Sequence, residues 1–142
     1  MFVKKRIEDA AALIVSGSLA ANNISGWQID KGLDTTINVF PCVKVVCKNW
    51  TPYAPENRIG HGSSDLEIIA CAVKVSTDPS DLETICDYIF NPFLADNAAD
   101  QLAGNTTNLQ VSQIIDGGWE STTLKDGWII FQKFKVVCSM TP

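Results

Sequence analysis

Histidine and paired cysteines are scarce in this sequence, and their scarcity argues against most metal-dependent and nucleophilic chemistry. The 142 residues include one histidine, His61, and no Cys-x-x-Cys motif. A zinc site needs close cysteine pairs or several histidines, and an activated nucleophile needs a base within reach. No glycine-rich phosphate loop opens an expected helix. The sequence therefore predicts no metal, no cofactor and no catalytic residue.

Positive charge and long apolar runs are also missing. The chain has 11 Lys and Arg against 16 Asp and Glu, for a formal net charge of -5. A nucleic-acid reader normally carries a basic stripe, whereas the only basic clusters, at residues 4–6 and at Lys133 and Lys135, are typical of solvated edges. No apolar run reaches the roughly 18 residues of a membrane span. Glu8 and Asp9 follow the basic start, so we expect no signal peptide and no membrane association.

The cysteines are odd in number and mostly surrounded by aliphatic residues. Free Cys is among the most buried residue types, and disulfides are rare in reducing compartments. We therefore expect five buried, free thiols in a protein made in a cytoplasm. They are Cys42, Cys47, Cys71, Cys86 and Cys138.

Acidic residues gather at two places but do not form a recognisable site. The first group surrounds an expected helix start, where capping and solvation explain carboxylates. The second, Asp96 and Asp100, lacks the ligand density of a calcium loop. Neither group is expected to bind a cation. The first group consists of Asp78, Asp81, Glu83 and Asp87.

Hydrophobic periodicity predicts an α+β fold in one domain over residues 1–142. Spacings of three and four residues favour helices, and alternation or short apolar runs favour strands. The expected helices are 3–21 and 79–91, and the expected strands are 42–50, 66–76, 109–116 and 127–140. Residues 27–41 are expected to be irregular and 96–104 to form a short helical turn. In the order α-β-β-α-β-β, these elements predict a four-stranded antiparallel sheet with both helices packed on one face and long inter-strand loops.

Two expected loops are the candidate interaction surfaces. Residues 51–65 contain two prolines and two glycines, and residues 117–127 are bracketed by Gly117-Gly118 and Asp126-Gly127. Loops of that length are often functional, and aromatic residues are enriched at interfaces. The interface candidates are Tyr53, His61, Trp119 and Thr123.

The layout of elements resembles the tail terminator and related neck (head–tail joining) proteins of long-tailed bacteriophages. The segments that carry the resemblance are the opening helix, Phe40-Pro41-Cys42-Val43-Lys44-Val45-Val46, Val73-Lys74-Val75-Ser76, the helix from Asp81 to Ile89, and the last strand from Gly127 to Phe134. The resemblance implies a structural, non-enzymatic virion subunit. It would be made in the host cytoplasm and form a hexameric ring that caps the tail tube. Its implied partners are copies of itself, the tail tube protein and the head connector or stopper protein. As a further hypothesis, DNA would pass through the lumen of such an acidic ring without specific binding, because like charge disfavours binding to phosphate.

A second hypothesis belongs to a different class. The same fold could serve a small-molecule binding or enzymatic module that uses the His61 loop, because fold does not determine function. A pocket that joins His61 to a thiol such as Cys71 would favour this alternative. A ring with His61 at a subunit boundary would favour the structural role.

Overall fold

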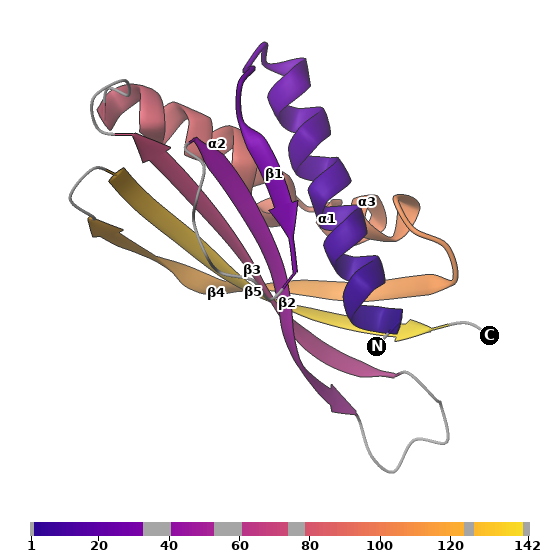
Figure 1. The fold of residues 1–142 in the computed structure, drawn as a ribbon. Coiled ribbons are helices and arrows are strands. Elements are labelled where there is room, and N and C mark those ends of the chain that lie inside the picture. The colour runs from indigo at the N-terminus through magenta and orange to yellow at the C-terminus, as the bar shows by residue number, and fades with distance from the viewer. Residues whose placement is uncertain (1, 33–40, 53–60, 74–78, 124–126, 141–142) are drawn as a thin grey trace.

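The computed structural model describes residues 2–32, 41–52, 61–73, 79–123 and 127–140. Within them the chain forms three helices and five strands (Figure 1). In chain order these are α1 (Phe2–Ala21), β1 (Gln28–Lys31), β2 (Cys42–Pro52), β3 (Gly62–Val73), α2 (Pro79–Leu94), α3 (Ala98–Gly104), β4 (Leu109–Thr123) and β5 (Gly127–Met140). None of the helices in these residues is long and apolar enough to cross a lipid bilayer.

The α+β class and the helical positions agree with the sequence, but the predicted sheet was wrong in strand number and partly in direction. The sheet has the order β1-β2-β3-β5-β4. Its first strand, β1, falls in the segment that was expected to be irregular and runs parallel to β2. The other neighbouring pairs are antiparallel. β1 is hard to recognise because it has four residues and a single large apolar side chain, Ile29.

Most of the residues that the structure describes in the two predicted loops belong to strands. β4 continues through the Gly117-Gly118 pair to Thr123 and shifts its register against β5 between Asp116 and Trp119. Gly118 has φ +89° there, and its N–H donates to Asp116 Oδ1 at 2.8 Å. The two glycines thus form a bulge inside a strand instead of starting a loop. Likewise, β2 and β3 extend into the predicted 51–65 loop, whose residues 53–60 lie outside the described part.

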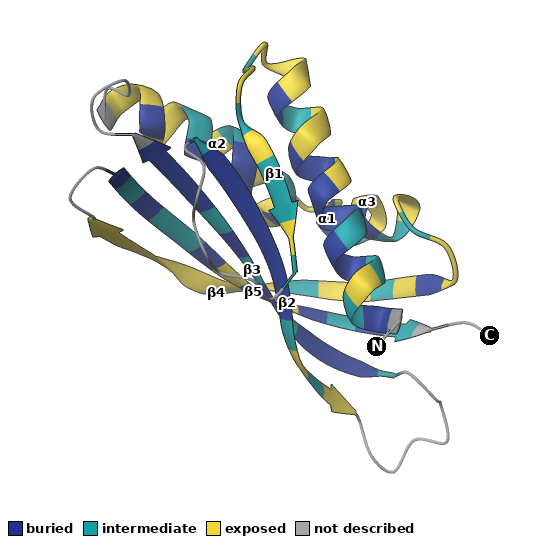
Figure 2. Ribbon diagram, in the orientation of Figure 1, coloured by how far each residue is buried: buried dark blue, intermediate teal, exposed yellow. Residues whose placement is uncertain are grey.

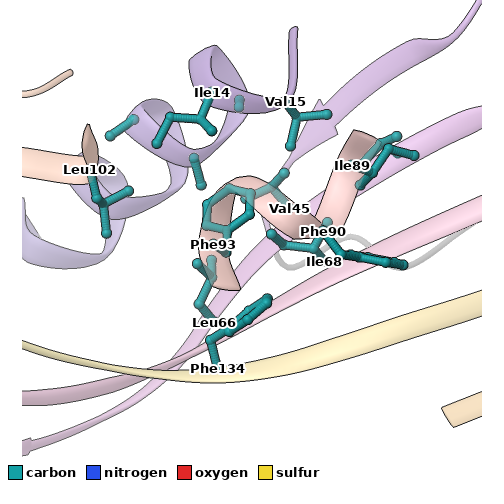
Figure 3. Packing of buried hydrophobic residues seen from close by; sticks show 14 of the residues in the cluster. Ile14, Val15, Val45, Leu66, Ile68, Ile89, Phe90, Phe93, Leu102 and Phe134 are labelled. Atoms are coloured by element: carbon teal, nitrogen blue, oxygen red, sulfur yellow. The ribbon is translucent and has the colours of Figure 1, made fainter. Parts of the chain in front are cut away.

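The core lies between the sheet and the helices, which all cover the same face. Figure 2 shows the buried residues concentrated along α1, α2 and the three central strands. β3 is the middle strand, as its apolar run predicted. In the close view of Figure 3, Phe93 of α2 reaches Phe134 of β5, with ring centroids 5.5 Å apart. Ile89 of α2 and, from the sheet, Val45 and Ile68 are fully buried in the same core cluster.

Two buried polar contacts connect α1 to its neighbours. Glu8 is only 6% exposed, and its Oε2 accepts the backbone N–H of Cys47 at 2.9 Å. β1 pairs with β2 only as far as Val45, so the backbone N–H of Cys47 has no partner on β1. The Glu8 carboxylate accepts this hydrogen bond instead. The Ser18 hydroxyl donates to the backbone carbonyl of Tyr88 in α2 at 2.5 Å.

Candidate interaction surface

A groove lies between α2 and the far half of the β4–β5 hairpin. Its volume is about 610 Å³. α3 contacts β4 and lies over its first part in Figure 1, whereas every residue of β4 from Gly117 to Thr123 is exposed. Figure 1 shows this end of the hairpin beside the start of α2, and Figure 2 shows its outer strand exposed. The hairpin therefore extends the sheet past its helical cover.

The floor of the groove is apolar and comes from two elements. Successive turns of α2 contribute one apolar residue each, at four-residue spacing on one side of the helix. These residues are Leu82, Cys86, Phe90 and Leu94. Trp128 and Ile130 of β5 lie opposite them. Leu94 is 46% exposed and Trp119, at the rim, is 66% exposed. Apolar side chains of this size gain from being covered by a partner.

The rim of the groove is polar and carries only negative charge. Glu83 and Asp87 of α2 are exposed and line it, together with Ser121 and Thr123 of β4. No Lys, Arg or His is among the described lining residues. The two carboxylates belong to the acidic group that the sequence assigned to capping and solvation. Here they border an apolar surface, which capping alone does not explain.

The one thiol in the groove is poorly suited to nucleophilic attack. Burial raises the pKa of Cys86 to about 12, with smaller contributions from the negative charges of Asp87 and Glu83. At neutral pH the group is therefore a neutral thiol. The groove combines an apolar floor with anionic borders, an arrangement suited to binding an apolar, cationic surface.

The structure brings together two of the four predicted interface residues. Trp119 and Thr123 both line the groove. His61 lies at the opposite end of the sheet, because it precedes Gly62, which pairs with Cys138, whereas Trp119 and Thr123 pair with Gln132 and Trp128. Tyr53 lies outside the described residues. Sequence reasoning did not identify the α2 side of the groove, although the continuation of the four-residue spacing from Phe90 to Leu94 was visible.

His61 and Cys71 do not meet in one chain. His61 immediately precedes the first residue of β3, and Cys71 is near the strand's other end. Ten residues of extended strand span about 33 Å. The groove is lined by neither residue. The pocket joining His61 to Cys71, which would favour the small-molecule binding or enzymatic hypothesis, is therefore not formed by these two residues of one chain.

All five thiols are free and buried, as the sequence predicted. Cys42 and Cys71 pair across β2 and β3, and a hydrogen bond from the Cys71 thiol lowers the pKa of Cys42 while raising that of Cys71. Their cluster with Ile129 lies on the face away from the helices. Among the described residues, no three His, Cys, Asp or Glu side chains are grouped closely enough to hold a metal ion.

The basic residues of the sheet do not form a cationic stripe. Lys133 and Lys135 are exposed on β5, and a shallow pocket beside them also contains Asp65 and Glu67. The Lys48 Nζ lies 2.6 Å from Glu67 Oε2, and the Lys133 Nζ lies 3.8 Å from Glu120 Oε1. Positive charge on this face is therefore largely balanced by neighbouring carboxylates.

No protein-family model and no curated protein matches this chain.

Proposed function

We propose that this protein is a structural, non-enzymatic subunit that assembles with copies of itself into a ring. The observation that carries the proposal is the apolar groove at the β4 edge of the sheet, with Trp119 exposed at its rim. Trp is the residue type most enriched at the energetic centres of protein interfaces. A lone subunit gains little from exposing it, whereas an assembly covers it.

We further propose that the ring is the tail terminator of a long-tailed bacteriophage. Support comes from the order of the main elements, which follows the resemblance once β1 and α3 are set aside. Four of the segments that carry the resemblance lie mainly in α1, β2, α2 and β5, which all contribute to the core, whereas residues 74–76 of the remaining segment lie outside the described part. In this role the ring caps the tail tube and joins it to the head connector or stopper protein, and the subunit is part of the virion.

The charge of the chain suits passage of DNA through such a ring. The formal net charge is -5, and the lysines of the β5 face are accompanied by carboxylates. Affinity for nucleic acid comes largely from cationic contacts to phosphate. A lumen built from this surface would let DNA pass without holding it.

The position of the protein in a virion tests this proposal. Intact virions from a genome that encodes the chain would be labelled with gold-conjugated antibody raised against the purified protein and imaged by electron microscopy. We expect label at the head–tail junction alone, and we expect none after the antibody is adsorbed with the purified protein. Label along the tail tube, label on the capsid, or absence of the chain from virions would each reject the tail-terminator role.

A further inference from the structure

We propose that the groove between α2 and the β4–β5 hairpin receives the outer face of α1 from a second copy of this chain, so that copies join head to tail. The outer face of α1 is defined here by Lys5, Asp9 and Leu13, which follow one another at four-residue spacing. This inference rests on the proposed function, because it names the contact that builds the ring.

The exposed apolar side chains point to these two surfaces. Four large hydrophobic residues are exposed among the described residues. Trp119 and Leu94 belong to the groove, and Leu13, which is 57% exposed, belongs to the outer face of α1. The fourth, Ile115, pairs with Lys135 on the face of the sheet away from the core residue Phe134. Three of the four are therefore explained by a single contact.

The two surfaces lie at opposite edges of the same sheet. Trp119 is on β4, the last strand in the order β1-β2-β3-β5-β4. Asp9 on the outer face of α1 pairs with Lys31 of β1 at 2.9 Å, which places that side of the helix at the first strand. Figure 1 shows α1 beside β1, whereas the far end of the hairpin, where β4 ends and β5 begins, lies on the other side of the sheet. A neighbouring copy placed side by side can thus present its α1 to the groove without covering its own.

Charge is complementary between the two surfaces at Lys5, while the one acid of the α1 face, Asp9, is already paired with Lys31 at 2.9 Å. The groove is bordered by Glu83 and Asp87 with no basic residue among its described lining. In the basic segment at residues 4–6, Lys4 pairs with Glu8 at 3.9 Å and Arg6 donates to the Asn108 carbonyl at 3.2 Å, which leaves Lys5 as the cation of the α1 face. Lys5 is exposed and belongs to none of the ion pairs found among the described residues. Opposite charges at an interface rim steer association and fix its register.

The geometry of such a contact determines the kind of assembly. The groove and the outer face of α1 are different surfaces, so the interface is heterologous and each copy retains one unused surface of each kind until the assembly closes. A closing rotation produces a ring. A two-fold dimer, by contrast, would use the same surface on both partners.

Two variants that each block one surface test the proposal by mixing. Leu13→Asp places a charge at the apolar position of the α1 face, and Glu83→Lys with Asp87→Lys reverses the charge of the groove border. Trp119→Ser is a second groove variant that changes an exposed side chain alone. The matched controls are Ile115→Asp and Asp96→Lys with Asp100→Lys, which make the same chemical changes at exposed positions outside both surfaces. Circular dichroism melting verifies that each variant is folded.

Native mass spectrometry then gives the result. We expect each blocked variant alone to be a monomer of about 15.5 kDa and the controls to assemble like the wild type. An equal mixture of Leu13→Asp with a folded groove variant should form dimers containing one copy of each and nothing larger, since only one intact groove and one intact α1 face remain. Wild-type assembly by both blocked variants, or mixtures without the mixed dimer, would overturn the contact. If the mixed dimer forms but virion label is absent from the head–tail junction, the contact stands and the tail-terminator role fails.

Discussion

At the scale of single residues, Pro92 of α2 removes a helical hydrogen bond, and Ser18 of α1 supplies a replacement donor. Proline has no N–H and removes the hydrogen bond that residue 92 would donate to the carbonyl of Tyr88. α2 nevertheless continues to Leu94, although the sequence predicted an end at residue 91. The Ser18 hydroxyl of α1 donates to that carbonyl at 2.5 Å. A contact between helices 70 residues apart in the chain therefore satisfies the group that proline left without its helical donor.

A double-mutant cycle measures this repair. Ser18→Ala should lower the free energy of unfolding by about 1–3 kcal/mol, because the Tyr88 carbonyl loses its donor. In the Pro92→Ala background the backbone N–H of residue 92 is available, so the same serine substitution should cost clearly less. Urea denaturation of the four proteins gives the coupling energy. If the two substitutions are additive, Ser18 and Pro92 do not act on the same carbonyl.

The thiols carry a second prediction at this scale, which concerns pH. Burial raises the pKa of Cys47 to about 11 and that of Cys86 to about 12, whereas an unfolded thiol titrates near 9.0. The folded chain thus holds these protons after the unfolded chain has released them. The stability they contribute is complete below pH 9 and is lost as pH rises through the folded pKa values. The urea midpoint should fall between pH 9 and 11, with a shallower fall in Cys86→Ala.

Thiol counting provides the control for the cysteine assignments. Denatured, unreduced protein should react with five equivalents of a thiol reagent, and native protein at pH 8 should react slowly because all five side chains are buried. A count of three would mean one disulfide, for which the cross-strand partners Cys42 and Cys71 are the first candidates, and would contradict the assignment of all five thiols as free.

At the scale of elements, sequence periodicity predicted the helices and strands that bury an apolar face. It missed the strand segments that form only by pairing with a neighbouring strand. α1 and β5 were predicted to within one residue, because their apolar spacing is long and regular. β1 was missed because a single half-buried residue, Ile29, cannot produce an alternating pattern. The position of this strand in the sheet depends on its pairing with β2. The far half of β4 was missed because Gly117-Gly118 suggested a turn, although a bulge in a paired strand uses the same residues.

Some residues of the groove could likewise be identified from the sequence, and others required the tertiary structure. Trp119 and Thr123 could be identified from sequence because they stand out in a polar segment. The α2 side of the groove could not, since an apolar helical stripe normally indicates core packing. Only the tertiary structure shows that the hairpin extends past α2 and leaves part of that stripe open. His61 was chosen for its chemistry, and its place at the other end of β3 could not be inferred without strand register.

The contribution of α2 to the core is a prediction at the element scale. Ile89 is fully buried, so Ile89→Ala should lower the free energy of unfolding by about 2–5 kcal/mol through lost burial and a residual cavity. Ile115→Ala makes the same change at a strand position that is 40% exposed and should cost less than about 1 kcal/mol. Equal costs in urea denaturation would remove α2 from the core.

At the scale of the whole molecule, the two edges of the sheet carry different surfaces, which we propose to be complementary. One edge carries α1 with exposed Leu13, and the other carries an apolar groove with exposed Trp119 and an acidic border. A subunit with two different surfaces at opposite edges is suited to head-to-tail association, which closes into rings when each step adds a fixed rotation. In the proposed role, such a ring caps the phage tail tube and joins it to the head connector.

The native mass of the purified wild-type chain tests the central claim most directly. The account predicts one closed species with the mass of six chains of 15.5 kDa, which stops growing as protein concentration rises because a closed ring leaves no free groove. A chain that stays monomeric at every concentration, or an open series of ever larger oligomers, would contradict it.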